Sequence, residues 1–230
     1  MFIIPSTAAT VFRYPLGLRV GALGPRPEKR LELYEFETCP FCRKVREALT
    51  MLDLEVVIRP APHGGERFRP EAIARGGKKQ FPLLVDPNVP AADQLIYESD
   101  AIVLHLYARY GAGPVPLGLR LGPLGNLTSS LASAMRLASG RTARPSRAPA
   151  EPLALWSFEG SPYCRRVREE LCELELPYVL HNAGTGSARR PALRARAGKV
   201  QFPYLEDPNT STKLFESRAI VRYLDTTYAN

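Results

Sequence analysis

Short apolar blocks along the chain predict strands and helices in a regular order. Leu31–Phe36 and Leu54–Ile58 have the length and apolar content of strands. Between them, apolar residues recur at three- and four-residue spacing from Val45 to Leu52, which predicts a helix with one buried face. A loop and a second helix, from about Arg69 to Arg75, follow.

A hairpin and a last helix complete this first set of elements. Pro82–Val85 and Gln94–Tyr97 flank Asp86-Pro87-Asn88, a turn signal, so the two segments are expected to pair. Ser99 is expected to cap a helix that ends at Tyr110. Residues 31–110 are therefore predicted to form a small α/β unit.

Three blocks of this unit recur in the same order later in the chain. Residues 36–47 (FETCPFCRKVRE) return as 158–169 (FEGSPYCRRVRE), 80–88 (QFPLLVDPN) as 201–209 (QFPYLEDPN), and 97–103 (YESDAIV) as 215–221 (FESRAIV). Such self-similarity indicates a duplication. Residues 151–230 are therefore predicted to repeat the fold, from a strand over Leu153–Phe158 to a helix over Ser217–Tyr228.

A short segment rich in Gly, Leu and Arg, which we call a preamble, precedes each unit, because Pro15–Gly21 resembles Pro116–Gly122. We expect residues 1–30 to form an N-terminal preamble or arm that is packed structure. Residues 1–12 remain open between a processed tail and an ordered arm.

Residues 111–150 are expected to connect the two units and to contain the second preamble. They end in an Arg/Pro-rich run, residues 141–149, that is predicted to be a flexible linker. A short helix is predicted over Leu124–Ala138.

The net charge of +8 is concentrated outside the two units. Residues 1–30 carry five Arg or Lys against one acidic residue, and residues 111–150 carry five Arg and no acidic residue. This distribution does not fit a nucleic-acid-binding face. It is typical of solvated linker arginines, or of basic arms that meet an acidic protein or an anionic lipid surface. No window is long and apolar enough for a transmembrane helix.

The four cysteines point to chemistry at a single motif. Cys39 and Cys42 form a C-x-x-C pair where a strand meets a helix, and backbone N–H groups there favour a thiolate. Arg43, Lys44 and Arg46 are expected to add positive charge. A zinc site would need a second pair of ligands, and His63, His105 and His181 are scattered, so the sequence favours redox chemistry and no metal.

The blocks resemble the glutaredoxin-like, thioredoxin-fold N-terminal domain of glutathione transferases, and their tandem order resembles the duplicated thioredoxin-family proteins of plant and algal plastids. The resemblance implies two tandem thioredoxin-like domains of the α/β class, a chloroplast location, and glutathione as co-substrate. Since the second unit stands in place of the helical transferase C-terminal domain, we expect no such domain and no pocket for conjugating bulky electrophiles. Trp156 and Phe158 are expected to be strand core residues.

The resemblance also implies roles for particular residues. Cys39 would be the nucleophile and Cys42 the resolving thiol. The glutathione-binding residues would be Phe81, the cis-proline Pro82, Glu98 and Ser99. The Glu-Ser pair suits a helix cap as well as a ligand site.

The second unit departs from this pattern because Ser161 replaces the nucleophilic cysteine, and a hydroxyl cannot perform thiol–disulfide exchange. Its degenerate site would comprise Ser161, Cys164, Phe202, Pro203, Glu216 and Ser217. Ser161 would hydrogen-bond a glutathione thiol or cap the helix. Cys164 and Cys172 are predicted to be buried thiols.

Two classes of function follow. The first is a glutathione- or thioredoxin-linked thiol–disulfide oxidoreductase that acts on protein or glutathione disulfides through Cys39. The second is a non-catalytic interaction module or accessory subunit of a larger complex. An iron–sulfur cluster held by Cys39 and glutathione across a dimer is a third possibility.

Overall fold

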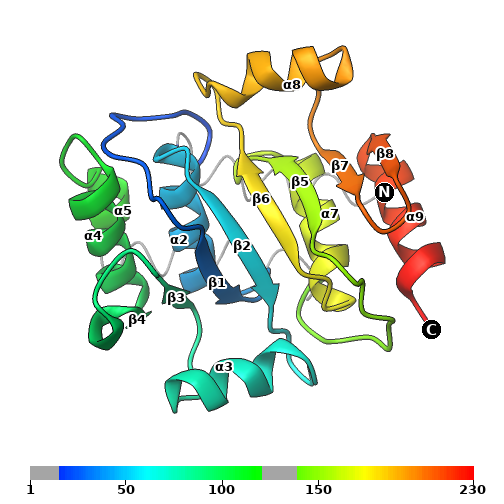
Figure 1. Cartoon of the computed structure of the whole chain (residues 1–230), viewed down its shortest axis with the longest axis horizontal. Coiled ribbons are helices and arrows are strands. Elements are labelled where there is room, and N and C mark those ends of the chain that lie inside the picture. The colour runs from blue at the N-terminus through cyan, green and yellow to red at the C-terminus, as the bar shows by residue number, and fades with distance from the viewer. Residues whose placement is uncertain (1–15, 121–138) are drawn as a thin grey trace.

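The computed structural model describes residues 16–120 and 139–230 (Figure 1). The predicted helix over 124–138, the preamble residues Leu121 and Gly122, and residues 1–15 lie outside this part of the chain. In residues 31–110 the elements are β1 (Leu31–Glu35), α2 (Pro40–Met51), β2 (Glu55–Pro60), α3 (Phe68–Gly76), β3 (Leu83–Val85), a 3-10 turn (Ala91–Asp93), β4 (Leu95–Tyr97) and α4 (Ser99–Tyr110). After α5 (Leu117–Arg120), residues 151–230 form β5 (Leu153–Ser157), α7 (Pro162–Glu173), β6 (Tyr178–Asn182), α8 (Arg189–Ala197), β7 (Tyr204–Asp207), β8 (Thr212–Phe215) and α9 (Ser217–Tyr228). We call residues 31–110 the first half and residues 151–230 the second half.

All eight strands belong to one mixed sheet with the order β4-β3-β1-β2-β6-β5-β7-β8. In each half the first two strands are parallel, and the other pairings are antiparallel. The halves meet where β2 and β6 pair antiparallel, with Val57 opposite Val179. The sequence predicts two small α/β units, and the structure joins their strands into one sheet because β2 and β6 pair along their edges. An apolar edge strand left unpaired would invite aggregation.

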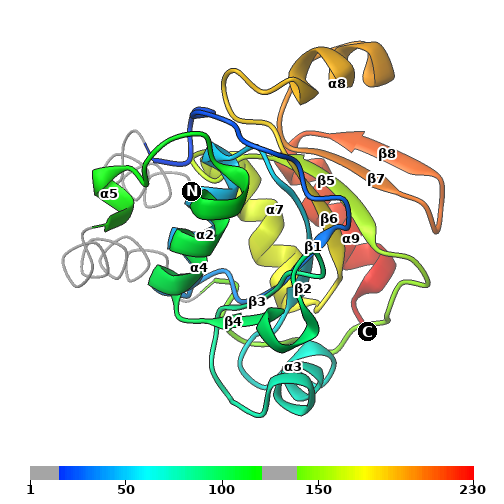
Figure 2. The same cartoon turned by 60° about the vertical axis from the view of Figure 1, so that its left-hand side comes forward.

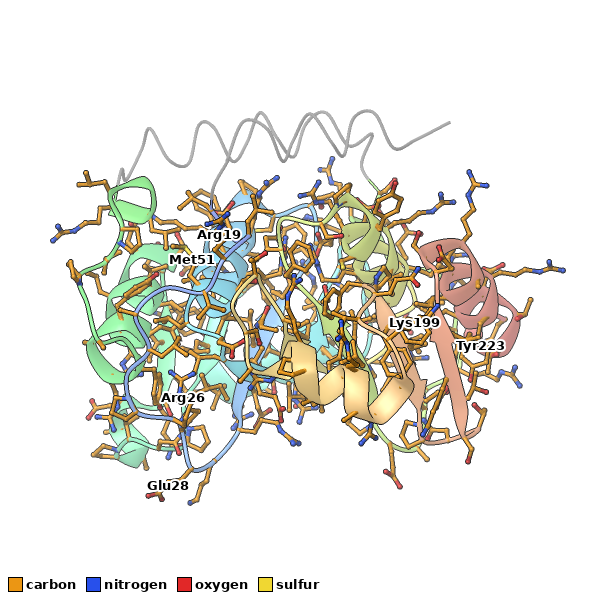
Figure 3. The ribbon with its side chains drawn as sticks, turned by 90° about the horizontal axis from the view of Figure 1, so that it is seen from above. Arg19, Arg26, Glu28, Met51, Lys199 and Tyr223 are labelled. Atoms are coloured by element: carbon orange, nitrogen blue, oxygen red, sulfur yellow. The ribbon has the colours of Figure 1, made fainter. Side chains whose placement is uncertain are left out.

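Helices cover both faces of the sheet. The largest apolar core lies under α2, α4, α7 and α9 and continues across both halves. Smaller cores lie on the opposite face, under α3 around Phe68 and under α8 around Leu193. Alternation along β1 produces this division, since Leu33 enters the large core and Tyr34 a small one. Figure 3 shows α2, α4, α7 and α9 on one side and α8 on the other. Within the described residues, no helix has the length and apolarity to cross a bilayer.

Buried charges lie where the two halves meet. Arg46 of α2 donates to Glu159 of the second half at 3.0 Å, and Arg168 of α7 donates to Glu37 of the first half at 3.2 Å. Arg46 also pairs with Glu35, and Arg168 with Glu159. All five side chains are buried. We call these five residues the central ion cluster. The first half supplies one arginine and two of the carboxylates, so its excess negative charge is compensated only when Arg168 of the second half is present.

Two extended segments bind across the halves, and we call residues 16–24 the first strap and residues 139–147 the second strap (Figure 2). In the first strap, Gly17 O accepts from Gly160 N of the second half at 2.9 Å. Its continuation pairs with the second half at Thr185 and then with the end of α4, where Gly24 N donates to Tyr110 O at 2.9 Å. Each strap therefore spans from one half to the other.

The second strap repeats these contacts with the halves exchanged. Its Arg141 O accepts from His63 N of the first half at 2.7 Å, and its Arg147 N donates to Tyr228 O of α9 at 2.7 Å. The predicted flexible linker over 141–149 is thus wrong for this part of the chain. Proline and arginine content suggested flexibility, but the backbone N–H and C=O groups find partners on both halves.

The strap contacts also correct the proposed preamble repeat. The structural counterpart of the first strap is the second strap, since Gly17 and Gly140 occupy equivalent places beside Glu159 and Glu37. The match of Pro15–Gly21 with Pro116–Gly122 was therefore misleading, because it aligned a strap with the segment that contains α5. Packing of the preamble itself is confirmed for residues 16–24.

Arginines outside the halves mostly bind the chain itself. Arg26 donates to Leu52 O and Tyr110 O, and Arg144 pairs with Glu170 and Asp225. Carbonyl groups at helix ends and carboxylates of the two halves therefore neutralise part of the excess positive charge of residues 16–30 and 139–150.

Candidate active site

Cys39 occupies the N-cap position of α2. Its backbone is extended, Pro40 begins the helix, and its Sγ accepts a hydrogen bond from Cys42 N at 3.3 Å. Proline suits this first position, where no intrahelical N–H bond is lost. Cys39 is 3% exposed and Cys42 is fully buried. Both thiols of the C-x-x-C motif are therefore buried, and Cys39 is the slightly more accessible of the two.

The two thiols are poised differently for ionisation. Burial opposes ionisation of Cys39, but hydrogen bonds from the Cys42 thiol and from the N–H groups of Cys42 and Phe41 outweigh it and lower the pKa of Cys39. Burial, together with its hydrogen bond to Cys39, raises the pKa of Cys42 well above its ordinary value. The pair thus combines a thiolate-prone sulfur with a protonated partner.

The expected contribution of neighbouring cations is wrong. Lys44 pairs with Asp100 of α4, Arg43 with Glu47, and Arg46 with the central ion cluster. These three side chains are buried and paired with carboxylates, so their positive charges are neutralised before they can act on Cys39. Glu35 is a charged group that acts on Cys39, and it raises the pKa of that thiol.

Aromatic rings and a cation surround the motif. The peptide bond between Phe81 and Pro82 is cis, as the resemblance implies. The Phe81 ring meets the Phe36 ring edge-on, with centroids 6.4 Å apart, and Phe36 O accepts from Cys39 N at 3.1 Å. The Arg69 guanidinium lies 4.6 Å from the Phe81 centroid. The loop that carries the cis-proline is thus brought beside the cysteine motif.

Glu98 and Ser99 join this end of the sheet. Glu98 has a φ of 66°, and its carboxylate accepts from Gln80 Nε2 of the cis-proline loop. Ser99 begins α4 and is buried, while Glu98 occupies the cap position without a side-chain cap bond. The expected Ser99 cap is therefore displaced by one residue. The exposed Glu98 carboxylate and the first amides of α4 suit the ammonium and carboxylate ends of a γ-glutamyl ligand.

The second half repeats this geometry without the nucleophile. Ser161 Oγ accepts from Cys164 N at 3.2 Å, and the bond between Phe202 and Pro203 is cis. Glu216 likewise has a φ of 70° and accepts from Gln201, while Ser217 begins α9. At the N-cap itself the two sites differ in one atom, sulfur in the first half and oxygen in the second.

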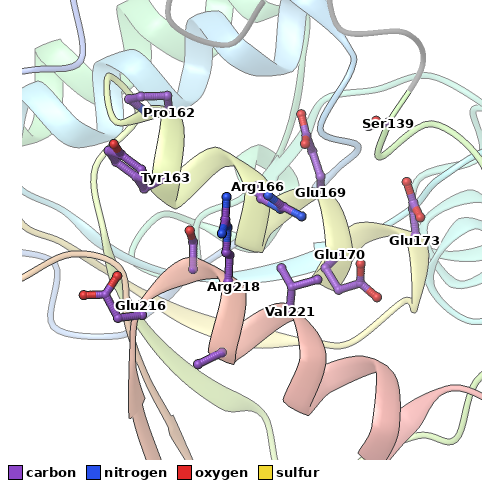
Figure 4. Close-up of a pocket in the computed structure, with 12 residues that line it drawn as sticks. Ser139, Pro162, Tyr163, Arg166, Glu169, Glu170, Glu173, Glu216, Arg218 and Val221 are labelled. Atoms are coloured by element: carbon purple, nitrogen blue, oxygen red, sulfur yellow. The ribbon is translucent and has the colours of Figure 1, made fainter. Parts of the chain in front are cut away.

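A cleft of about 700 Å³ lies beside the second site, between α7 and α9 (Figure 4). Tyr163, which follows Pro162 at the start of α7, is half exposed on its wall. Its other walls include Arg166, Arg218 and Glu216. This cleft is a hollow next to a site whose N-cap residue carries a hydroxyl in place of a thiol.

The remaining cysteines are buried, as predicted. Cys164 is fully enclosed under Ser161. Cys172 connects the halves, because its Sγ accepts from Glu37 N at 3.4 Å and donates to Gly140 O at 3.3 Å. Trp156 is likewise a core residue, whereas Phe158 is half-buried beside Phe202.

Sequence reasoning missed the cations and the ring that border the motif. Arg69 and its counterpart Arg190 each lie over two phenylalanine rings and donate to two backbone carbonyls. His63 packs against Phe36 with ring centroids 5.1 Å apart. The dipeptide Arg-Pro recurs at 69–70 and 190–191, between the matched blocks, and was the available signal. Within the described residues, no group of three or more His, Cys, Asp or Glu side chains is placed to hold a metal ion.

Comparison with known proteins gives one family. The model of the glutathione S-transferase N-terminal domain matches residues 33–114 and again 155–230. A solved structure of a Bombyx mori glutathione transferase, BmGSTD1, is 24% identical over 39% of this chain and 39% of its own length, with a TM-score of 0.33. A trimeric glutathione transferase of Leishmania, TDR1, is 12% identical over 88% of this chain and 68% of its own, with a TM-score of 0.31. No curated protein matches the chain.

Proposed function

The chain belongs to the glutathione S-transferase N-terminal domain family, and we propose that it is a glutathione-linked thiol–disulfide oxidoreductase that acts through Cys39. The observation that carries this proposal is the pair of thiols at the start of α2. Cys39 is the N-cap sulfur, it accepts from Cys42 N, and its pKa is lowered while that of Cys42 is raised. Low-pKa thiols at helix N-termini are the reactive ones.

The substrate disulfide is reduced in two successive thiol–disulfide exchanges. The Cys39 thiolate attacks one sulfur of a substrate disulfide, a new S–S bond forms, and the leaving thiolate takes the electron pair of the broken bond and then a proton. Cys42 loses its proton to solvent, and its sulfur attacks Cys39, releasing the second substrate thiol. Two electrons pass from the dithiol to the substrate. Two glutathione molecules then reduce the Cys39–Cys42 disulfide and leave as glutathione disulfide.

Glutathione as the electron donor is supported by the residues around the motif. Glu98 offers an exposed carboxylate to an ammonium group, and the first amides of α4 offer donors to a carboxylate. The cis bond before Pro82 lies beside the cysteine motif, where an extended peptide would lie along Phe81.

As part of this proposal we place the protein in the plastid, which a fluorescent fusion of the full chain tests.

Substitution of the two motif cysteines tests the reaction. Cys39→Ser is expected to abolish glutathione-dependent disulfide reduction by the full chain, because no other described thiol occupies an N-cap. Cys42→Ser is expected to retain exchange with glutathione mixed disulfides and to lose the intramolecular disulfide. Ser161→Ala is the matched control at the equivalent cap and should keep full turnover. Unchanged turnover in Cys39→Ser would refute the proposal.

A second candidate concerns the second half, where Ser161 stands at the cap beside the 700 Å³ cleft. This half would bind glutathione or a partner protein without redox chemistry, and the whole chain would then serve as an interaction module or an accessory subunit of a larger complex. A partner that copurifies equally with the wild-type chain and Cys39→Ser, while disulfide reduction is absent from both, would favour this candidate.

A further inference from the structure

Four basic side chains border the Cys39 site, and we call His63, Arg69, Lys79 and Arg141 the basic rim. The second strap forms part of it, because His63 N donates to Arg141 O at 2.7 Å and Ala143 N donates to His63 O at 2.9 Å. This parallel pairing places Arg141 beside His63, and both residues are exposed. A residue from the connector thus contributes to the border of a site in the first half.

The rim is fixed to the aromatic rings around the cysteine motif. The Arg69 guanidinium is buried over Phe81 and Phe36, at 4.6 and 5.8 Å from their centroids, and donates to Ala61 O and Pro62 O. The His63 ring meets Phe36 edge-on at 5.1 Å. Cys39 N donates to Phe36 O, so the rings that carry Arg69 and His63 belong to the segments that flank the cysteine motif.

The charges of the rim act on one another and on the thiols. Burial, and then Arg69, Arg141 and Lys79, lower the pKa of His63. The interactions of Arg69 extend to both Cys39 and Cys42. Arg69, Arg141 and Lys79 therefore lie close enough to His63 for salt at cellular strength not to screen them fully, and of these three only Arg69 is seen to interact with the thiols.

The second half lacks this rim although it repeats the fold. Arg190 matches Arg69, but Thr185 stands at the position of His63 and Val200 at that of Lys79. The strap contact there comes from Leu18, whose O accepts from Thr185 N at 2.8 Å. Four carboxylates, Glu169, Glu170, Glu173 and Glu216, line the neighbouring cleft together with Arg166 and Arg218 (Figure 4). The basic rim is therefore a property of the site that carries the thiol and does not follow from the fold.

We propose that the basic rim selects disulfides that lie in acidic protein segments, so that the physiological substrate presents carboxylates around its disulfide to Arg69, Lys79 and Arg141. This inference rests on the proposed function, because it names the substrate class of the Cys39 reaction. Complementary charge raises the rate of encounter more than it raises final affinity. The selectivity should therefore appear in the rate of attack and should decline as salt increases.

Two peptides test the selectivity. Each carries one intrachain disulfide, flanked in one peptide by Asp and Glu and in the other by Asn and Gln, and each is reduced in a single turnover by the pre-reduced full chain. The acidic peptide should react about tenfold faster at low salt, and the difference should shrink at high salt.

Arg141→Gln and Lys79→Gln change exposed side chains and should each reduce the ratio of the two peptide rates. Arg222→Gln removes the same charge from the exposed surface of α9 and should leave it unchanged. Glutathione disulfide is the third substrate, and a rate loss in the rim variants confined to it would overturn selection of protein segments.

Alkylation of Cys39 separates failure of the rim from failure of the proposed function. Iodoacetate is anionic and iodoacetamide is neutral, so their rate ratio at Cys39, compared with that at free glutathione, reports the local potential without any turnover. We expect this ratio to be raised, and to fall in Arg141→Gln but not in Arg222→Gln. A raised ratio without reduction of any disulfide would overturn the proposed function while leaving the rim established. Equal reduction of both peptides, together with an alkylation rate ratio equal to that of free glutathione, would overturn the proposed role of the basic rim. Failure of both reagents to reach Cys39 would contradict the proposed function itself.

Discussion

At the scale of single residues, the N-cap positions of α2 and α7 differ in one side-chain atom. Cys39 and Ser161 both cap a helix that begins with proline, and both accept from the N–H three residues later, at 3.3 and 3.2 Å. The backbone environment that stabilises a thiolate is thus present twice. Only sulfur can ionise and exchange under ordinary conditions, so the proposed redox reaction is open to the cap of the first half and closed to that of the second.

The lowered pKa of Cys39 predicts its reactivity with pH. The thiolate is the reacting form, so alkylation by iodoacetamide should rise with pH and level off at a lower pH than for an ordinary cysteine. Cys42, whose pKa is raised, should remain unmodified over the same range. Rates measured by mass spectrometry of each peptide check this. Cys42→Ala removes one donor to Cys39 and should move the midpoint upward; a midpoint at or above that of free cysteine in the wild-type chain would contradict the interpretation.

The motif residues were accessible to sequence reasoning, and their electrostatic surroundings were not. Spacing alone located Cys39 and Cys42 at a helix start. It could not show that Arg46 is neutralised by Glu159, which lies 113 residues away in sequence. Nor could it show that the strap brings Arg141 to His63. Long-range ion pairs depend on how elements pack, and local patterns do not encode that packing.

At the scale of elements, the straps connect each half to the site of the other. Gly140 has a φ of 74°, and a Cβ there would lie 2.9 Å from Glu37 Cβ and 3.2 Å from the Glu169 backbone. Gly17 occupies the equivalent place against Glu159. Glycine is required twice over at these positions, for its backbone conformation and for the close approach.

Replacement of Gly140 separates these two requirements. Gly64 also has a positive φ, 75°, but nothing lies within 4 Å of the place that its Cβ would occupy. Gly64→Ala should therefore lose only the conformational part of the unfolding free energy, about 1–2 kcal/mol. Gly140→Ala should lose about 1–3 kcal/mol more because of overpacking. Urea denaturation of both full-length variants measures this difference, and equal losses would show that the close contact is relieved without cost.

Most elements could be predicted from the sequence, but the joining of the halves could not. The helix predicted after a cap at Ser99 ends at Tyr110 as predicted but includes Ser99 itself, and the strand predicted over 54–58 is observed at 55–60. Periodicity specifies which face of a strand is buried. It carries no information about which strand covers an edge, so the pairing of β2 with β6 left no signature in the pattern.

At the scale of the whole molecule, the central ion cluster connects the two halves energetically. A buried ion pair adds little stability compared with apolar packing, but removing one partner leaves an uncompensated charge. Because Arg46 and Glu159 come from different halves, separation of the halves would break their ion pair and leave each with only its partner in the same half. The cluster therefore favours one arrangement of the halves over others.

Glu159 makes this dependence testable through pH. Burial opposes its ionisation, but Arg168, Arg46, Arg165 and Arg43 outweigh burial and hold the pKa of Glu159 well below its ordinary range. A carboxylate with a depressed folded-state pKa stabilises the fold above its unfolded pKa, about 4.3, and this stabilisation is lost as pH falls toward the folded value. Glu159→Gln should therefore cost about 3–5 kcal/mol of unfolding free energy at pH 7.

The difference between the Glu159→Gln variant and the wild-type chain should shrink in urea titrations repeated at decreasing pH below about 4. Asp225→Asn, which breaks the exposed pair with Arg144, is the control and should cost at most about 1 kcal/mol. A cost of Glu159→Gln that stays constant from neutral to acid pH would show that its effect comes from packing, and the cluster would then not act through charge.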